Sequence, residues 1–113
     1  MRRAGGYTPQ VNAKFGPLVA HLTDEFGNPL AGWTVLFQSV NIGRPGATFD
    51  KSDTIGAKFA VATDPKGDAK SSTLTANGMA GTYKISATVL NGNRQPVKFK
   101  GKEVSAEFPI ENK

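Results

Sequence analysis

Apolar and polar residues alternate along most of the chain with a period of two, and not with the 3.6-residue period of a helix. This pattern buries one face of each strand and leaves the other face in water, as in antiparallel strands of a sandwich or barrel. The clearest alternation runs over residues 83–89. The residues predicted to face the core are Leu18, Leu22, Trp33, Val35, Phe37, Phe59, Val61, Tyr83, Ile85, Ala87, Val89, Val104 and Phe108.

Residues that favour turns separate these runs at the spacing expected of a β-sandwich. Two of the breaks, at residues 23–27 and 63–67, share the pattern Thr-Asp-x-x-Gly. No window of twelve residues has the pattern of an amphipathic helix, so seven or eight short strands are predicted. The residues predicted to shape the turns are Asp24, Gly27, Asn28, Pro29, Gly32, Asp64, Gly67, Gly78 and Gly81.

The length of 113 residues fits one domain, and 13 glycines and 7 prolines favour strands joined by turns over helices. The chain has no cysteine, which excludes disulfides, thiolate zinc sites and cysteine nucleophiles. No apolar run is long enough to span a membrane, and the first ten residues lack the apolar region of a signal peptide. We expect residues 1–9 to be a flexible lead and residues 10–113 to form a single domain.

The net charge of +5 is compatible with an ordinary soluble surface. Basic residues gather only near the C-terminal end, at Arg94, Lys98, Lys100 and Lys102, so nucleic acid is not the expected partner. These lysines protect a strand edge in one interpretation and contact acidic glycans in another. The ligand-binding candidates, which include residues of the aperiodic loops 43–46 and 50–56, are Arg44, Lys51, Arg94, Lys98 and Lys100.

The aspartates of the two Thr-Asp-x-x-Gly turns are the candidates for a metal site. Asp24 lies in the first turn, close to Glu25, and Asp64 and Asp68 lie in the second. Calcium takes six to eight oxygens, usually from several carboxylates of one shaped loop, and that loop spacing is missing. The favoured interpretation is that these carboxylates accept backbone N–H bonds within Asx-turns.

Enzymatic activity is not expected. His21 is the single histidine and is placed by the alternation on the solvent face of its strand. The chain has no G-x-S-x-G nucleophile motif, and a sandwich of this length seldom forms the cleft of a two-carboxylate glycosidase. No catalytic residue and no cofactor is therefore predicted.

Two aromatic residues have particular interpretations. Trp33 shares the parity of Val35 and Phe37, which predicts a core position, while its place near a strand start leaves stacking on a sugar ring as the alternative. Tyr83 begins an inward-facing run after a glycine, where a sandwich can place a tyrosine whose hydroxyl bonds nearby backbone.

The order of these motifs resembles the bacterial Ig-like domains of the Big-1 group, the repeats of invasin- and intimin-type surface proteins. The resemblance covers about residues 10–112, with departures at Trp33, where the family usually has valine, and in the lysine-rich stretch 98–102. The positions that carry the resemblance in the first half are Pro17, Leu18, Asp24, Gly27, Asn28, Pro29, Gly32, Val35 and Phe37. Those in the second half are Asp64, Gly67, Ala69, residues 76–78, residues 80–83, Ile85, Ala87 and Val89.

The resemblance implies an immunoglobulin-like β-sandwich of two antiparallel sheets with seven to nine strands. It also implies a non-catalytic module at the bacterial cell surface, anchored in the outer membrane through other sequence, with termini at opposite ends of the domain. Its expected partners are neighbouring Ig-like domains and a protein or glycan of a host or neighbouring cell. The alternatives are a module that binds carbohydrate or protein through loops 43–46 and 50–56, and a decoration domain of a virion or secretion apparatus.

Overall fold

The computed structural model describes residues 2–4, 7–24, 26–39, 44–51, 58–93, 95–99 and 102–113, of which 2–4, 98–99 and 102–103 are described by their backbone alone. These residues form twelve strands and no helix. In the described part of the chain, no helix has the length and apolar character needed to cross a membrane.

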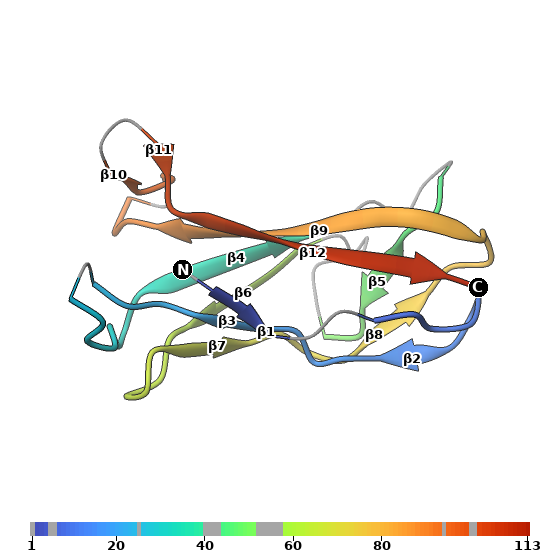
Figure 1. Ribbon diagram of the computed structural model, residues 1–113, viewed down its shortest axis with the longest axis horizontal. Coiled ribbons are helices and arrows are strands. Elements are labelled where there is room, and N and C mark those ends of the chain that lie inside the picture. The colour runs from blue at the N-terminus through green and yellow to red at the C-terminus, as the bar shows by residue number, and fades with distance from the viewer. Residues whose placement is uncertain are drawn as a thin grey trace.

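The strands pack as two layers around one core (Figure 1). One layer is a four-stranded antiparallel sheet in the order β12-β9-β4-β6. Its strands are β4 (Thr34–Gln38), β6 (Lys58–Ala62), β9 (Gly81–Leu90) and β12 (Ser105–Asn112).

The other layer consists of two three-stranded antiparallel sheets. The first has the order β1-β3-β7, with β1 (Arg2–Ala4), β3 (Val19–His21) and β7 (Asp68–Lys70). The second has the order β2-β8-β5, with β2 (Lys14–Phe15), β8 (Leu74–Ala76) and β5 (Ala47–Phe49). A small hairpin joins β10 (Lys98–Phe99) to β11 (Lys102–Glu103).

The second layer is split into two sheets because two of its long strands are each interrupted near the middle. β2 and β3 follow one line, as do β7 and β8 (Figure 1). At the interruptions the Ser71 Oγ accepts the Leu18 N–H at 2.9 Å, and the Ser71 N–H donates to the Leu18 carbonyl at 2.8 Å. With each line counted once and the β10–β11 hairpin set aside, the twelve strands reduce to eight. The predicted all-β antiparallel sandwich is confirmed.

The alternation predicted the core correctly for most positions. Phe37 is completely buried at the centre, with ring centroids 6.0 Å from Phe108 and 6.4 Å from Phe49. Phe49 and Leu74, which the sequence analysis did not assign to the core, are also buried. The predicted core residues confirmed as buried are Leu18, Leu22, Val35, Phe37, Ile85, Ala87, Val89 and Phe108. Those only half-buried, packed against the core from its margin, are Phe59, Val61, Tyr83 and Val104.

The prediction that Trp33 is a core residue is wrong, because 40% of its surface is exposed. Its backbone N–H donates to the Thr63 Oγ1 at 3.0 Å and its carbonyl accepts the Thr63 N–H at 2.8 Å. These bonds hold Trp33 just before β4 begins, at the end of the sandwich. Trp33 has the same strand parity as Val35, but it lies where the hydrophobic core ends, so its side chain is only partly covered.

Residues 1–9 were expected to be a flexible lead, and the described residues among them belong to the sandwich instead. β1 pairs with β3 over three residues, from Arg2 opposite His21 to Ala4 opposite Val19. Tyr7 forms a parallel bridge with Ile110, and its hydroxyl donates to the Pro17 carbonyl at 2.9 Å. The sheet edges at β3 and β12 recruit this segment, which has no alternating pattern of its own.

The chain enters the domain and leaves it at different places along the long axis. The molecule measures 40 × 25 × 25 Å along its principal axes. β1 lies beside β3 with its first residue directed toward the end that holds the Asp24 and Asp64 turns, whereas Lys113 lies at the other end (Figure 1). We call these ends the turn end and the C-terminal end.

Candidate functional site

The carboxylates of Asp24 and Asp64 hold the two turns at the turn end. The Asp24 Oδ1 accepts the backbone N–H groups of Phe26 at 2.8 Å and Asn28 at 2.9 Å. The Asp64 Oδ1 accepts those of Lys66 and Asp68, each at 2.9 Å. The pKa of each aspartate is lowered, chiefly by the bond from the residue four positions on, because these bonds favour the charged carboxylate.

The third metal candidate, Asp68, faces a different partner. Its Oδ1 lies 2.7 Å from the Nδ1 of His21, directly across the β3–β7 pair. The sequence analysis placed His21 on a solvent face and missed this contact, which depends on the register of two strands far apart in sequence. Among the described residues, no three His, Asp or Glu side chains lie together in a way that could hold a metal ion. The Asx-turn interpretation is therefore what the geometry of Asp24 and Asp64 supports.

Two of the predicted turn glycines are required by their surroundings. Gly67 has a φ of +81°, and a Cβ there would lie 2.5 Å from the Leu22 carbonyl oxygen. Gly81 has a φ of +143°, and a Cβ there would lie 2.7 Å from the Pro45 Cγ. Gly27 and Gly32 also have positive φ but face open space, and Gly78 does not have a positive φ.

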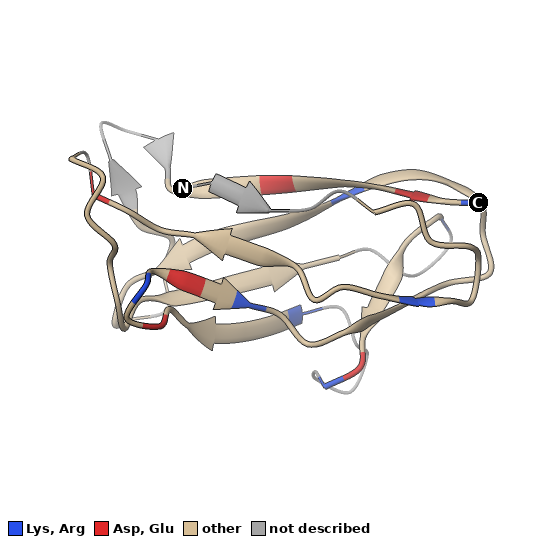
Figure 2. Ribbon diagram, turned by 60° about the horizontal axis from the view of Figure 1, so that its bottom comes forward, with Lys and Arg blue, Asp and Glu red and all other residues tan. Residues whose placement is uncertain are grey.

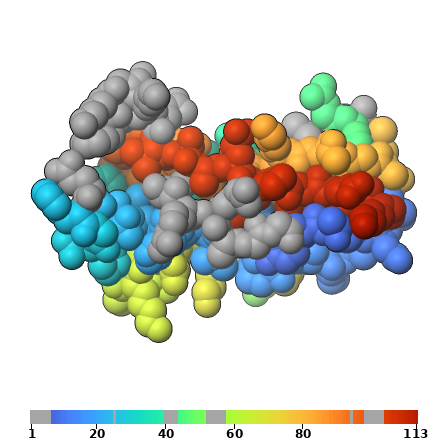
Figure 3. Space-filling view, in the orientation of Figure 1, coloured from blue at the N-terminus to red at the C-terminus, as the bar shows by residue number. Residues whose placement is uncertain are grey.

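The turn end also exposes two aromatic side chains. Phe26, at the tip of the first turn, is 81% exposed, and Trp33 is 40% exposed. The segment that carries Phe26 projects at the left of Figure 3, in cyan. Trp33 is therefore accessible to a ligand, as the alternative interpretation from the sequence requires.

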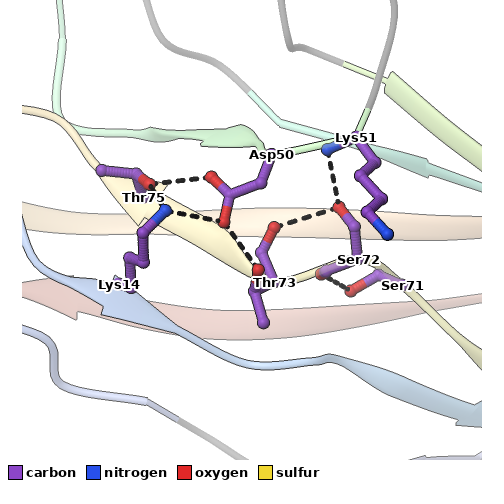
Figure 4. A network of polar contacts seen from close by, with 7 residues as sticks. All are labelled: Lys14, Asp50, Lys51, Ser71, Ser72, Thr73 and Thr75. Atoms are coloured by element: carbon purple, nitrogen blue, oxygen red, sulfur yellow. Dashed lines mark hydrogen bonds and ion pairs between the residues drawn. The ribbon is translucent and has the colours of Figure 1, made fainter.

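A polar network on the outer surface of the second layer centres on Asp50 (Figure 4). Its Oδ2 accepts the Thr73 hydroxyl at 2.6 Å and the Lys14 ammonium at 3.1 Å, and its Oδ1 accepts the Thr75 hydroxyl at 2.8 Å. The network ties β2 and β8 to the residue that follows β5. The sequence analysis placed Asp50 only in the candidate binding loop 50–56 and missed this network, because its partners lie 23 to 36 residues away.

The donors around Asp50 favour its carboxylate form. The bond from Thr73 makes the largest contribution to lowering the pKa of Asp50, followed among the favourable contributions by the bonds from Thr75 and Lys14. An acid held in this way is a poor proton donor at neutral pH. It is also a poor electrophile for an amide bond to Lys14, because that reaction needs a protonated carboxyl group. The network is suited to joining strands.

Acid should therefore weaken this network selectively. Since the folded pKa of Asp50 is depressed, its contribution to stability is present above the unfolded pKa of about 3.9 and is lost as the pH falls through the folded value. We expect Asp50→Asn to lower the free energy of unfolding by roughly 1–2 kcal/mol at pH 7 and to have progressively less effect toward pH 2. Urea unfolding of both proteins across this range measures the difference.

A matched control is Glu107→Gln, which removes an exposed carboxylate that forms an ion pair with the exposed Lys84, 4.0 Å away. It should change stability by a few tenths of a kcal/mol at most. A loss for Asp50→Asn that stayed constant from pH 7 to pH 2 would show that charge on Asp50 is unimportant.

The ligand-binding candidates do not form one site among the described residues. Arg44 and Lys51 are exposed, and each is held through its backbone: the Arg44 carbonyl accepts the Asn77 Nδ2 at 2.9 Å, and the Lys51 N–H donates to the Ser72 Oγ at 3.4 Å. Lys98 lies in β10, where only the backbone is described. Figure 2 shows the described Lys and Arg residues spread along the molecule. Arg94, Lys100 and most of loop 50–56 lie outside the described residues, so these candidates stay predictions.

A buried polar cluster closes the C-terminal end. Asn112 is only 2% exposed, and its Nδ2 lies 3.0 Å from the Gly46 carbonyl oxygen and 3.2 Å from that of Met79. The hydroxyl of Tyr83 donates to the Asn112 Oδ1 at 3.1 Å, so it bonds this side chain and not nearby backbone as the sequence predicted. Burial raises the pKa of Tyr83 well above its usual value. No local sequence pattern predicts this cluster, because Asn112 bonds to residues that are distant from it in the sequence.

An open groove of about 500 Å³ lies where residues 7–8 run beside β9 and β12. Its apolar lining comes from Tyr7, Tyr83, Pro109 and Ile110, and the charged residues Lys84 and Glu111 also line it. The sequence analysis missed it because residues 1–9 were treated as a lead.

When the chain was compared with models of known protein families, with curated proteins and with solved structures, none of the three comparisons gave a match.

Proposed function

We propose that this domain is a non-catalytic module of a bacterial surface protein, and that it acts as a rigid spacer beside neighbouring Ig-like domains of an invasin- or intimin-type adhesin. The motif order described above suggests this class. The observation that carries the proposal is the path of the chain, which enters toward the turn end and leaves at the C-terminal end of a 40 Å axis.

Modules joined in tandem need entry and exit points that are separated and held in place. Arg2 is paired with His21, whose side chain contacts Asp68 beside the turns. At the other end Lys113 exchanges backbone bonds with Pro9 and Val11, and Asn112 is anchored by its buried contacts. With both ends tied to the sandwich, the orientation of one module can be passed to the next.

The hydrogen bonds of three aspartates also support a structural role. The carboxylates of Asp24 and Asp64 are occupied by turn N–H groups, and that of Asp50 by strand side chains and an ammonium. Donors that stabilise a carboxylate lower its basicity and make it a weaker general base. These residues therefore have structural uses that account for their presence without catalysis.

The proposal is tested by deleting residues 1–113 from the native protein on the cell surface. Removing one spacer should shorten the distance from the cell to a label on the outermost part of the protein by about 40 Å, the long dimension of the domain. Electron microscopy of gold-labelled cells measures that distance. A label that protease cannot reach on intact cells, or a distance that the deletion leaves unchanged, would count against a surface spacer.

A further inference from the structure

We infer that the segment of residues 7–11 and the end of β12 form a mechanical clamp that resists tension applied through the two ends of the domain. The biological use of such a clamp rests on the proposed spacer function, since a surface protein that attaches cells carries load along its length. The clamp itself rests on the contacts of residues 7–11 with β12 and with the rest of the sandwich, whatever the function of the protein.

Residues 7–11 lie parallel to the last residues of β12. The Glu111 N–H donates to the Tyr7 carbonyl at 3.1 Å, and the Lys113 N–H donates to the Pro9 carbonyl at 2.9 Å. The Val11 N–H donates to the Lys113 carbonyl at 3.0 Å. Tyr7 and Ile110 form a parallel bridge. Figure 3 shows this dark blue segment lying against the red end of β12.

The parallel direction decides how these bonds are loaded. Tension on the N-terminal side pulls residues 7–11 toward the turn end, while tension on Lys113 pulls β12 out at the C-terminal end. The two pulls act along the strands and in opposite directions (Figure 1). The three backbone bonds are therefore strained together in shear. When a strand pair is instead pulled apart from one end, its hydrogen bonds break one after another. The applied force then has to break only one bond at a time.

Both sides of the clamp are anchored. The Tyr7 hydroxyl donates to the Pro17 carbonyl at 2.9 Å, and its ring centroid lies 5.6 Å from that of Phe15. β12 pairs with β9 over eight residues. Pro109 has no N–H and shares the strand parity of Glu111, so the donors toward residues 7–11 begin at Glu111. Tension applied at residue 1 first meets the three-residue pairing of β1 with β3, and it then reaches the bonds between residues 7–11 and β12.

Single-molecule pulling tests the direction of loading. Because the chain has no cysteine, a cysteine introduced at an exposed site is a unique handle. In the first geometry the domain is pulled through residues 1 and 113, and in the second through Gln10→Cys and residue 113, which lie at the same end of the clamp. We expect a clearly higher unfolding force in the first geometry. Equal forces in the two geometries would overturn the clamp.

A substitution pair tests the bonds themselves. Glu111→Pro removes the N–H that donates to Tyr7, at a parity that the strand already accepts proline at Pro109, and Glu111→Ala keeps that N–H. At a given force through residues 1 and 113, the proline variant should unfold about fivefold faster than the alanine variant. Equal rates would also overturn the proposal. If the proline variant does not fold, the pulling comparison is repeated with Thr8→Cys, an exposed position that follows β1, in place of residue 1, and equal forces would again overturn the clamp.

These results are independent of where the native protein resides. A domain that resists shear but belongs to a protein inside the cell would refute the spacer function and leave the clamp intact. The opposite result is a surface protein that shortens when the domain is deleted, but whose domain unfolds at the same force in both pulling geometries. That result would refute the clamp and leave the spacer function intact.

Discussion

Replacing Phe37 by alanine is expected to lower the free energy of unfolding by about 3–5 kcal/mol, the largest effect of any single substitution we propose. Phe37 has no exposed surface and contacts the rings of Phe49 and Phe108 from opposite layers. Truncation leaves a cavity that the rigid strands on both sides cannot close, so transfer and cavity costs add. The loss is a large part of the stability of a domain this size.

Chemical unfolding followed by circular dichroism measures this effect, and Trp33→Ala is the matched control. It also removes a large aromatic ring on the same parity of the same segment, but from a position that is 40% exposed. We expect Trp33→Ala to cost about 1 kcal/mol. A cost for Trp33→Ala equal to that for Phe37→Ala would contradict the placement of the two rings.

Replacing Asn112 by alanine should have the second largest effect, a loss of about 2–3 kcal/mol. The buried amide serves the carbonyls of Gly46 and Met79 and accepts the Tyr83 hydroxyl. Alanine leaves these groups without the partner that the buried Asn112 side chain supplied, and the cost of an unsatisfied buried group exceeds the value of the bond that was lost.

The loss should be local as well as global, and hydrogen exchange can show this. The amides of Val11 and Lys113, beside Asn112 at the C-terminal end, should exchange faster in Asn112→Ala, while those of β4 keep their relative protection. Asn93→Ala is the control, since Asn93 lies exposed in a turn and should change stability by less than about 0.5 kcal/mol. An Asn112 variant as stable as the Asn93 variant would show that the cluster contributes nothing.

The comparison between Phe37 and Trp33 shows how far the alternation can be used. Both residues have the parity of the inward face, and this parity follows from the strand period alone. The alternation therefore predicted correctly that Phe37 is buried. Whether an inward side chain is covered depends on where the opposite layer ends, and Trp33 lies where the core ends.

The turns and the N-terminal segment differ for a similar reason. Asp24 and Asp64 bond to N–H groups two and four residues away, so the residue pattern was enough to predict their role. The described part of residues 1–9 is ordered by the free edges of β3 and β12, which come from later parts of the chain. No local pattern reports such an edge, and the segment was therefore taken for a lead.

The sequence by itself determined the all-β class, the centre of the core and the two Asx-turns, because side-chain alternation and short hydrogen-bonded turns depend on neighbours within a few residues. Only the tertiary structure decided the exposure of Trp33, the pairing of His21 with Asp68, the Asp50 and Asn112 clusters and the parallel contact of residues 7–11 with β12. Each of these depends on which strands become neighbours, and that choice is made by the packing of the whole chain.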